Sequence, residues 1–425
     1  MTGQNPRQIA IRVLRQRRPS GDYVEKLLEG ELACHALSSP DRALCQELVY
    51  GIVRWQRALD WLIERKTGGR DQTAALRILL QLGLYQLFWL QRIPDHAAVH
   101  ETVELAKHLG FGPRAGFLNA VLRGYIRQRE QTRDMLEGLK KTDPATGYSH
   151  PAWLVERWQA RWGQAQTVQL LACNNCPPPT YARLNELKTD AARLAARWQE
   201  EGLEFEERQY DWTGPGLVFE LRSHPPLATL GSFQDGWFYV QDPSTLLATR
   251  QLDPQPGETI LDLCAAPGGK TTHIAARMKN RGRIVARDNQ PERLKRLQEN
   301  CRRLGATCVE TAAAPGPFDR ILIDAPCSNT GVLRRRVDVR WRVQSGEIAR
   351  LSQAQSALLV EAAPFLKPGG TLVYSTCSLE PEENEEVVRR FLNDHPSFKL
   401  ENERQLLPFI EAVDGAYVAT LCRQP

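Results

Sequence analysis

Residues 1–141 carry apolar side chains at helical spacing. From Leu44 onward, apolar positions recur every three or four residues, and the spacing continues through Leu79 to Phe88 and Val99 to Leu109. This periodicity predicts helices that each bury one face. Pro94 separates two of them because proline lacks the backbone donor that a helix interior needs. The sequence therefore predicts an all-α bundle over residues 1–141.

The pattern changes after this bundle. Three consecutive prolines follow Cys176 and mark a stiff connector. Residues 180–240 then mix short strand candidates with one helix from Asp190 to Glu201. We therefore expect a small α+β middle domain over residues 142–233.

Strand and helix patterns alternate over residues 234–425. Apolar runs at Thr259 to Leu263, Ile321 to Ile323 and Leu372 to Tyr374 are typical of strands buried on both faces, and helical patterns lie between them. Strands alternating with helices predict a doubly wound, mostly parallel sheet. The predicted fold is thus an α/β Rossmann-like domain preceded by an all-α bundle and a small α+β domain.

Composition narrows the class of protein. A length of 425 residues predicts two or three domains, and 25% charged with 42% hydrophobic residues excludes a disordered or fibrous chain. The longest apolar stretch, Leu76 to Ile93, is interrupted by polar residues, so we expect no membrane span. With ten cysteines and no secretory signal, we expect reduced thiols and a cytoplasmic location.

Charge is concentrated in the first segment. Residues 1–141 hold 22 basic and 15 acidic residues, although the whole chain has a surplus of only five positive charges. This asymmetry favours a polyanionic partner. A plain solvated helical surface explains it equally well.

A glycine-rich turn follows the strand that ends near Asp262. Ligands of open α/β sheets bind beyond such strand ends, where glycine lets the backbone approach the ligand. The spacing fits neither the dinucleotide fingerprint nor the phosphate loop. The candidate cofactor loop consists of Cys264, Ala265, Ala266, Pro267, Gly268, Gly269 and Lys270.

An acidic residue follows the next predicted strand. Asp288 lies 20 residues after Gly268, the separation at which an acid reaches a ribose hydroxyl in adenosine-binding sheets. It would equally cap the helix that begins near Pro291. Together with the glycine-rich turn, Asp288 favours a nucleoside-containing cofactor.

Two cysteines follow two further strands. Cys327 ends the segment that begins with Asp324, and Cys377 follows Thr376. Parallel strands bring both to the edge of the sheet that carries the cofactor turn, where a thiolate is a candidate covalent nucleophile. A lone cysteine is more often a small core residue, but two at strand exits are harder to explain that way.

These blocks carry a family resemblance. LDLCAAPGGKTTHI, DRILIDAPCSNTGVLRRR and GGTLVYSTCSLEPEENE resemble signature blocks of the S-adenosylmethionine-dependent RNA 5-methylcytosine methyltransferases. ELVYGIVRWQRALDWLI and NAVLRGYIR resemble a NusB-like RNA-binding domain. The resemblance covers nearly the whole chain. It implies a class I methyltransferase domain, S-adenosylmethionine as cofactor and RNA, specifically small-subunit ribosomal RNA, as partner.

The resemblance also implies residue roles. Cys264 to Lys270 would hold the cofactor and Asp288 its ribose, while Asp324 would lie between cofactor and target base. Cys377 would be the nucleophile and Cys327 would assist release of the product. Asp324 and Lys270 would hydrogen-bond the base edge.

Three further features of the sequence bear on its function. Arg334, Arg335 and Arg336 follow the Cys327 loop and are interpreted as a phosphate clamp, with a solvated charge run as the alternative. Cys173 and Cys176 lack a second ligand pair, so no metal is expected. The chain lacks the Gly-Asp pair that the family places after its fourth strand, and Glu310 is a weak substitute.

Two alternative functions remain open. A DNA cytosine methyltransferase is not one of them, because it would carry a Glu-Asn-Val block, which is absent here. A non-catalytic RNA-binding or ribosome assembly factor, or a methyltransferase acting on another RNA such as tRNA, fits the same blocks. We expect a monomer with no membrane association.

Overall fold

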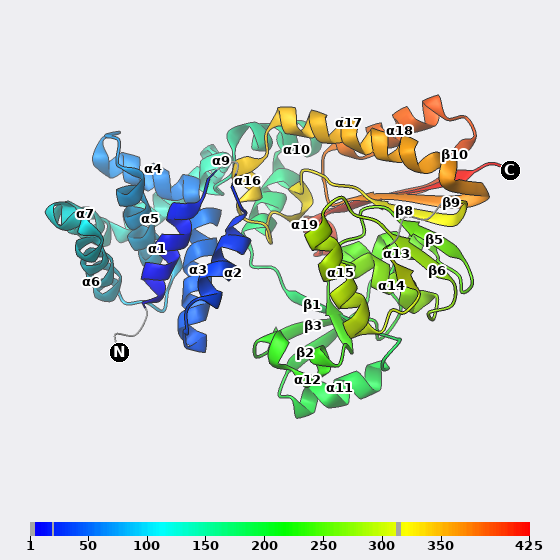
Figure 1. Cartoon of the computed structure of the whole chain (residues 1–425). Helices are drawn as coiled ribbons and strands as arrows, with labels where there is room; N and C mark the ends of the chain where they lie inside the picture. The colour runs from blue at the N-terminus through cyan, green and yellow to red at the C-terminus, as the bar shows by residue number, and fades with distance from the viewer. Residues whose placement is uncertain (1–4, 19–20, 312–315) are drawn as a thin grey trace. The chain divides into compact units, whose positions relative to one another are not determined.

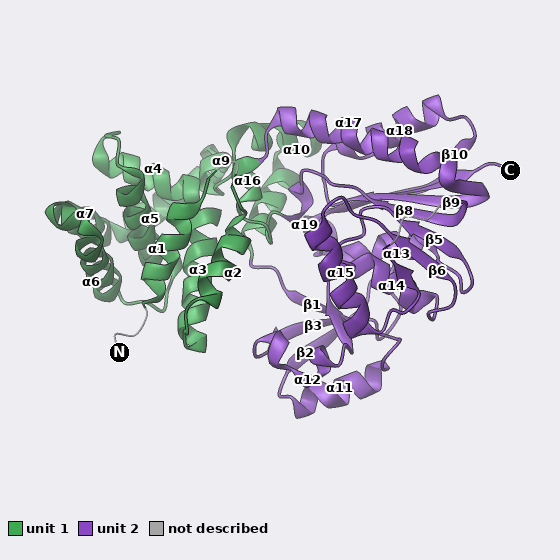
Figure 2. Ribbon diagram, viewed as in Figure 1, with its two compact units in different colours: residues 1–176, 333–342 green, residues 177–332, 343–425 purple. Residues whose placement is uncertain are grey.

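The computed structural model describes residues 5–18, 21–311 and 316–425. The chain forms two compact units (Figure 2). The first contains residues 1–176 and 333–342, and the second contains residues 177–332 and 343–425. These units do not coincide with the three segments predicted from sequence, because residues 142–176 group with the helical bundle. The three boundaries stay a prediction.

The first unit is helical, as the apolar spacing predicts (Figure 1). Its core buries Leu48, Leu80 and Leu118 completely. The described part of the chain holds no helix both long and apolar enough to cross a membrane. The helices are α1 (Pro6–Gln16), α2 (Val24–Ala33), α3 (Ser39–Arg54), α4 (Gln56–Thr67), α5 (Ala74–Trp89), α6 (Asp95–Ala106), η1 (Lys107–Phe111), α7 (Gly112–Arg127), α8 (Arg129–Thr142), α9 (Pro144–Gly147), α10 (Ala152–Asn175) and α16 (Val339–Arg342).

The second unit begins with a small antiparallel sheet of order β2-β3-β1-β4. Trp198 of α11 is fully buried against it and contacts aromatic rings of three strands. The predicted α+β middle domain is confirmed in this sheet and its helices. Its elements are β1 (Thr180–Leu184), α11 (Ala191–Glu200), β2 (Glu204–Arg208), β3 (Val218–Ser223), η2 (Leu227–Thr229), α12 (Gly231–Gln234) and β4 (Phe238–Val240).

A seven-stranded sheet of order β10-β11-β9-β8-β5-β6-β7 forms the rest of this unit. Its strands are parallel from β9 to β7, whereas β11 pairs antiparallel with both β9 and β10. The strands are β5 (Thr259–Asp262), β6 (Arg283–Ala286), β7 (Val309–Glu310), β8 (Phe318–Asp324), β9 (Leu366–Thr376), β10 (Phe398–Leu406) and β11 (Ala416–Arg423).

Helices cover both faces of this sheet, so its strands are apolar on both sides. Leu322 of β8 packs in the core that includes α13, α14 and α15 residues, whereas its neighbours Ile321 and Ile323 pack in the core that includes α17 and α18 residues. The remaining elements are η3 (Pro243–Thr245), α13 (Leu246–Leu252), α14 (Gly269–Arg277), α15 (Pro291–Leu304), η4 (Thr330–Val332), α17 (Ser345–Ala362), η5 (Ala363–Phe365), η6 (Pro381–Glu383), α18 (Glu385–Asp394) and α19 (Pro408–Glu411).

The strand order creates a switch point at β5. The chain passes from β5 to β6 on one side, and later returns to β8 on the other side. In open α/β sheets, ligands bind outside the carboxyl ends of the strands at such a point. The residues that follow β5, β8 and β9 therefore surround the expected site.

Candidate active site

The glycine-rich turn connects β5 to α14. Gly268 has a φ of 103°, and a Cβ there would lie 3.2 Å from Leu297 Cγ, so any other residue would be strained. Asp288, just after β6, accepts a hydrogen bond from the Ala266 amide at 3.3 Å, and its side chain is only 2% exposed. The structure brings these two predicted parts of a cofactor site together. The ribose contact of Asp288 stays a prediction.

Asp262 lies beneath this turn, at the end of β5. Its side chain is fully buried, and Thr271 Oγ1 donates to Asp262 Oδ2 at 2.7 Å, while Oδ1 has no hydrogen-bond partner. Burial raises the pKa of Asp262 to about 7. The hydrogen bond between Asp262 and Thr271 thus connects the end of β5 to α14 and stabilises the turn between them.

A charged pair connects the turn to the end of β8. Lys270 Nζ, in the first turn of α14, lies 2.6 Å from Asp324 Oδ2, and Ser375 Oγ of β9 donates to Asp324 Oδ1 at 2.9 Å. Both charged side chains keep partial solvent contact, at 14% and 35% exposure. The pair is therefore accessible to a ligand that binds at the ends of these strands.

The two cysteines lie side by side, although 50 residues separate them in sequence. Cys327 Sγ and Cys377 Sγ are 3.3 Å apart, and Cys377 Sγ donates to Asn329 Oδ1 at 3.2 Å. Asn329 has a φ of 61°, a conformation that asparagine tolerates, and its Nδ2 donates to the Cys327 carbonyl at 2.7 Å. These contacts fix the amide oxygen of Asn329 toward Cys377.

The two thiols have different surroundings. The hydrogen bond with Cys377 and burial hold the pKa of Cys327 well above its usual value, and Glu383 adds to this effect. Cys327 therefore stays protonated and can donate to the sulfur of Cys377. The assignment of Cys377 as the nucleophile stays a prediction.

Comparison with known proteins gives the family. The profile of the 16S rRNA methyltransferase RsmB/F family matches residues 249–421, the NusB family matches 4–127, and the ferredoxin-like domain of RsmF/B-like methyltransferases matches 150–217. A Synechocystis protein named probable ribosomal RNA small subunit methyltransferase B is 42% identical, covering 93% of this chain and 90% of its own. The chain belongs to the RsmB/F family.

Two further relatives agree with this membership. A Bacillus subtilis protein with the same name is 35% identical and covers 98% of both chains. The crystal structure of PH0851 has a TM-score of 0.79 at 26% identity and covers 99% of both chains. Family membership confirms the predicted fold class and the reaction class, an S-adenosylmethionine-dependent RNA methyltransferase.

The three consecutive arginines after the Cys327 loop of this RsmB/F family member differ in solvent exposure. Arg336 is exposed, Arg335 is half-buried, and Arg334 is only 5% exposed. Arg334 is therefore less accessible to a phosphate than its two neighbours. Phosphate binding by Arg334, Arg335 and Arg336 stays a prediction.

Arg340, four residues further on, holds this segment in the helical unit. It is fully buried, and burial lowers its pKa to about 9. Its guanidinium donates to backbone carbonyls and one amide side chain, at distances from 2.8 to 3.3 Å. The acceptors are the carbonyls of Arg54, Ser149, Asn174 and Leu333 and the side chain of Asn175.

We expect Arg340→Met to lower the free energy of unfolding by about 2–4 kcal/mol, because the loss of one buried cation leaves several carbonyls without a donor. Arg336→Met changes an exposed arginine of the same segment and should shift stability by less than about 0.5 kcal/mol. Thermal and denaturant unfolding of both variants measure the difference. Equal stability of the two variants would contradict the role of Arg340.

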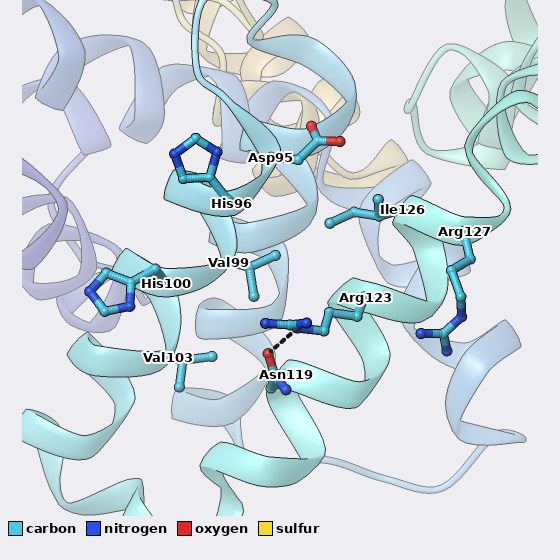
Figure 3. Close-up of a pocket in the computed structure, with 9 residues that line it drawn as sticks. All are labelled: Asp95, His96, Val99, His100, Val103, Asn119, Arg123, Ile126 and Arg127. Carbon is cyan, nitrogen blue, oxygen red and sulfur yellow. Dashed lines mark hydrogen bonds between the residues drawn. The ribbon is translucent and has the colours of Figure 1, made fainter.

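A basic pocket of about 410 Å³ lies between α6 and α7 of the helical unit (Figure 3). Val99, Val103 and Ile126 are its apolar lining residues, and Arg123 Nε donates to Asn119 Oδ1 at 3.0 Å. Within the described residues, neither Arg123 nor Arg127 forms an ion pair. The lining residues are Asp95, His96, Val99, His100, Val103, Asn119, Arg123, Ile126 and Arg127.

Sequence reasoning missed several residues that support the site. Arg183 of β1 is 1% exposed and donates to the Gly269 carbonyl at 2.6 Å and to Thr272 Oγ1 at 3.1 Å, so the middle sheet supports α14. No local signal marks Arg183, because it lies in an ordinary strand pattern.

Glu310, the weak substitute for the missing acid, forms an ion pair with Arg283. The neighbouring residues Ala312 to Pro315 lie outside the described part of the chain.

Proposed function

We propose that this protein transfers a methyl group from S-adenosylmethionine to C5 of a cytosine in RNA, and that small-subunit ribosomal RNA is the substrate. The observation that carries the proposal is the 3.3 Å approach of Cys327 and Cys377 at the strand ends. Names of relatives support the choice of RNA. The predictions of a monomer and of a cytoplasmic location remain part of this proposal.

Cytosine chemistry explains why a thiolate is needed. C5 of cytosine is too electron-poor to attack a methyl donor directly. When the Cys377 thiolate bonds to C6, electron density moves to C5, which becomes enamine-like and accepts the methyl group. Loss of the C5 proton to a base and cleavage of the S–C6 bond then restore the ring and the free thiolate. Covalent catalysis thereby divides one difficult step into easier ones.

The residues around the turn fit the cofactor. S-adenosylmethionine supplies the methyl group as an electrophile when bound. Cys264 to Gly269 and Lys270 would hold it through backbone contacts, while Asp288, next to the turn, would bind its ribose. The turn is held by buried contacts of Asp262 and Arg183, so the backbone is preorganised for a ligand.

Two side chains would hold the target base. Asp324 and Lys270 already form a charge-assisted pair next to the strand ends, and both side chains are partly exposed. Hydrogen bonds from this pair to the base edge would favour addition of the thiolate at C6. The cytosine must leave its stack to reach them, so an unpaired or transiently opened base is the substrate.

The helical unit would supply RNA affinity. Arg123 and Arg127 of the pocket and the exposed Arg336 would contact phosphates. Replacing both Arg123 and Arg127 by Gln should weaken RNA binding about tenfold at moderate salt and reduce the salt slope by about 1–2. Fluorescence anisotropy over a salt series measures both quantities.

A matched pair of changes controls that measurement. Arg65→Gln with Arg70→Gln removes the same charge from exposed positions outside the pocket. We expect a smaller loss of affinity from this pair. Equal losses would show that the pocket contributes only general charge.

Bisulfite mapping tests the proposal as a whole. Ribosomal RNA from cells with and without this protein should differ at one cytosine of the small subunit. A difference found in tRNA instead would identify another RNA as substrate. Unchanged cytosines together with tight binding to ribosomal RNA would favour a non-catalytic assembly factor.

A further inference from the structure

A buried carboxylate connects the two cysteine loops. Glu383 ends η6, six residues after Cys377, and its side chain has no solvent exposure. Its oxygens accept hydrogen bonds from the Ser328 amide at 2.8 Å, the Ser328 hydroxyl, and Ser378 Oγ at 2.5 Å. Ser328 directly follows Cys327, and Ser378 directly follows Cys377. One carboxylate thus contacts the neighbour of each sulfur.

Further contacts make this connection rigid. Gln355 of α17 donates to Glu383 Oε1 at 3.1 Å and also to the Pro326 carbonyl at 2.8 Å. Tyr374 of β9 donates its hydroxyl to the Glu383 carbonyl at 2.6 Å. The residue is therefore held from α17 and β9, as well as from the two loops.

The donors are arranged for an ionised carboxylate. Four hydrogen bonds reach the two oxygens. One comes from the Ser328 backbone amide, which only donates, and one from Gln355 Nε2, which the Pro326 carbonyl also holds as a donor. Burial raises the pKa of Glu383, but these donors oppose that shift. A negative charge here also raises the pKa of the Cys327 thiol.

We propose that Glu383 is a positioning residue for the methyl-transfer reaction, holding the Cys327 and Cys377 loops at one fixed sulfur spacing. The inference rests on the proposed function and goes beyond it. Neither sulfur touches Glu383; the carboxylate acts through Ser328 and Ser378. Without it, each loop loses its buried anchor, and the two sulfurs sample many separations.

Two substitutions separate geometry from charge. In Glu383→Ala all four acceptor contacts are lost, and we expect kcat for RNA methylation to fall by about 100-fold or more. In Glu383→Gln the remaining oxygen still accepts from Ser328 and Gln355, and the hydroxyls can rotate to accept from the new amide. We therefore expect its kcat within about tenfold of the original protein.

The binding constants distinguish positioning from general damage. KM for RNA and the dissociation constant for S-adenosylmethionine should stay within about threefold in both variants, because Glu383 contacts neither binding surface. Glu386, three residues after Glu383 in the first turn of α18, is half-buried, and among the described residues its side chain forms no hydrogen bond to either loop. Glu386→Gln is therefore the matched control and should leave kcat unchanged.

A substrate-free readout tests Glu383 independently of the proposed function. Iodoacetamide alkylation, followed by mass spectrometry across a pH series, reports the reactivity of each cysteine. We expect both Glu383 variants, but not Glu386→Gln, to shift the profile of Cys327 to lower pH, because a negative charge is removed. Should Glu383→Ala fail to fold, Glu383→Gln and the double change of Ser328 and Ser378 to Ala supply the same measurements.

The outcomes are distinct. An unchanged kcat in Glu383→Ala, a loss confined to KM, or unaltered alkylation profiles would overturn the positioning role. If the original protein methylates no RNA while Glu383→Ala still alters the alkylation profile, the proposed function fails and the link between the cysteines stands.

Discussion

Cys377→Ala should abolish RNA methylation, with a loss of at least about 10⁴-fold in kcat. The thiolate of Cys377 is the group that would activate C5, and removal of a covalent nucleophile costs about this much or more in enzymes that depend on one. Transfer of a radiolabelled methyl group to small-subunit ribosomal RNA measures the loss. Binding of S-adenosylmethionine, measured by calorimetry, should stay unchanged, because the cofactor turn lies on other elements.

A second cysteine provides the control for this variant. Cys422 is half-buried like Cys377, but it pairs with Thr371 in the middle of β9, away from the strand end that Cys377 follows. Cys422→Ala should keep full activity. Methylation retained by Cys377→Ala would remove the covalent mechanism from this protein.

Cys327→Ala should accumulate a covalent complex between protein and RNA. In this variant Cys377 can still add to C6 and C5 can still accept the methyl group, but the thiol that would assist release is missing. The adduct should be visible as a slower band on a denaturing gel, which disappears after RNase treatment. We expect most of the RNA-bound protein to be trapped, with turnover reduced by about 100-fold or more.

The same gel separates the roles of the two cysteines. The double variant, Cys327→Ala with Cys377→Ala, should form no adduct. An adduct in Cys377→Ala but not in Cys327→Ala would show that the roles are exchanged. That outcome would conflict with the raised pKa of Cys327, which keeps this sulfur protonated.

The local sequence was sufficient to predict the helices and strands and to place the candidate catalytic residues at strand ends. Apolar spacing predicted the helical bundle, and apolar runs predicted the buried strands, because both patterns follow from the geometry of a single element. Parallel strands with their carboxyl ends at one edge were enough to predict that Cys327 and Cys377 would meet near the cofactor turn. The resemblance added the reaction class.

Tertiary structure alone decided which residues support that site. Arg183 contacts its partners across elements distant in the chain, and nothing in its local sequence distinguishes it from an ordinary strand residue. Glu383 lies in a quoted signature block, but nothing local shows which of the neighbouring acids is buried against the Cys327 loop. Arg334 is another example. The sequence does not distinguish it from Arg335 and Arg336, but it is buried, because residues 333–342 pack in the helical unit. Spacing along the chain fixes which side of an element a residue occupies, whereas burial and hydrogen-bond partners depend on what packs against that side.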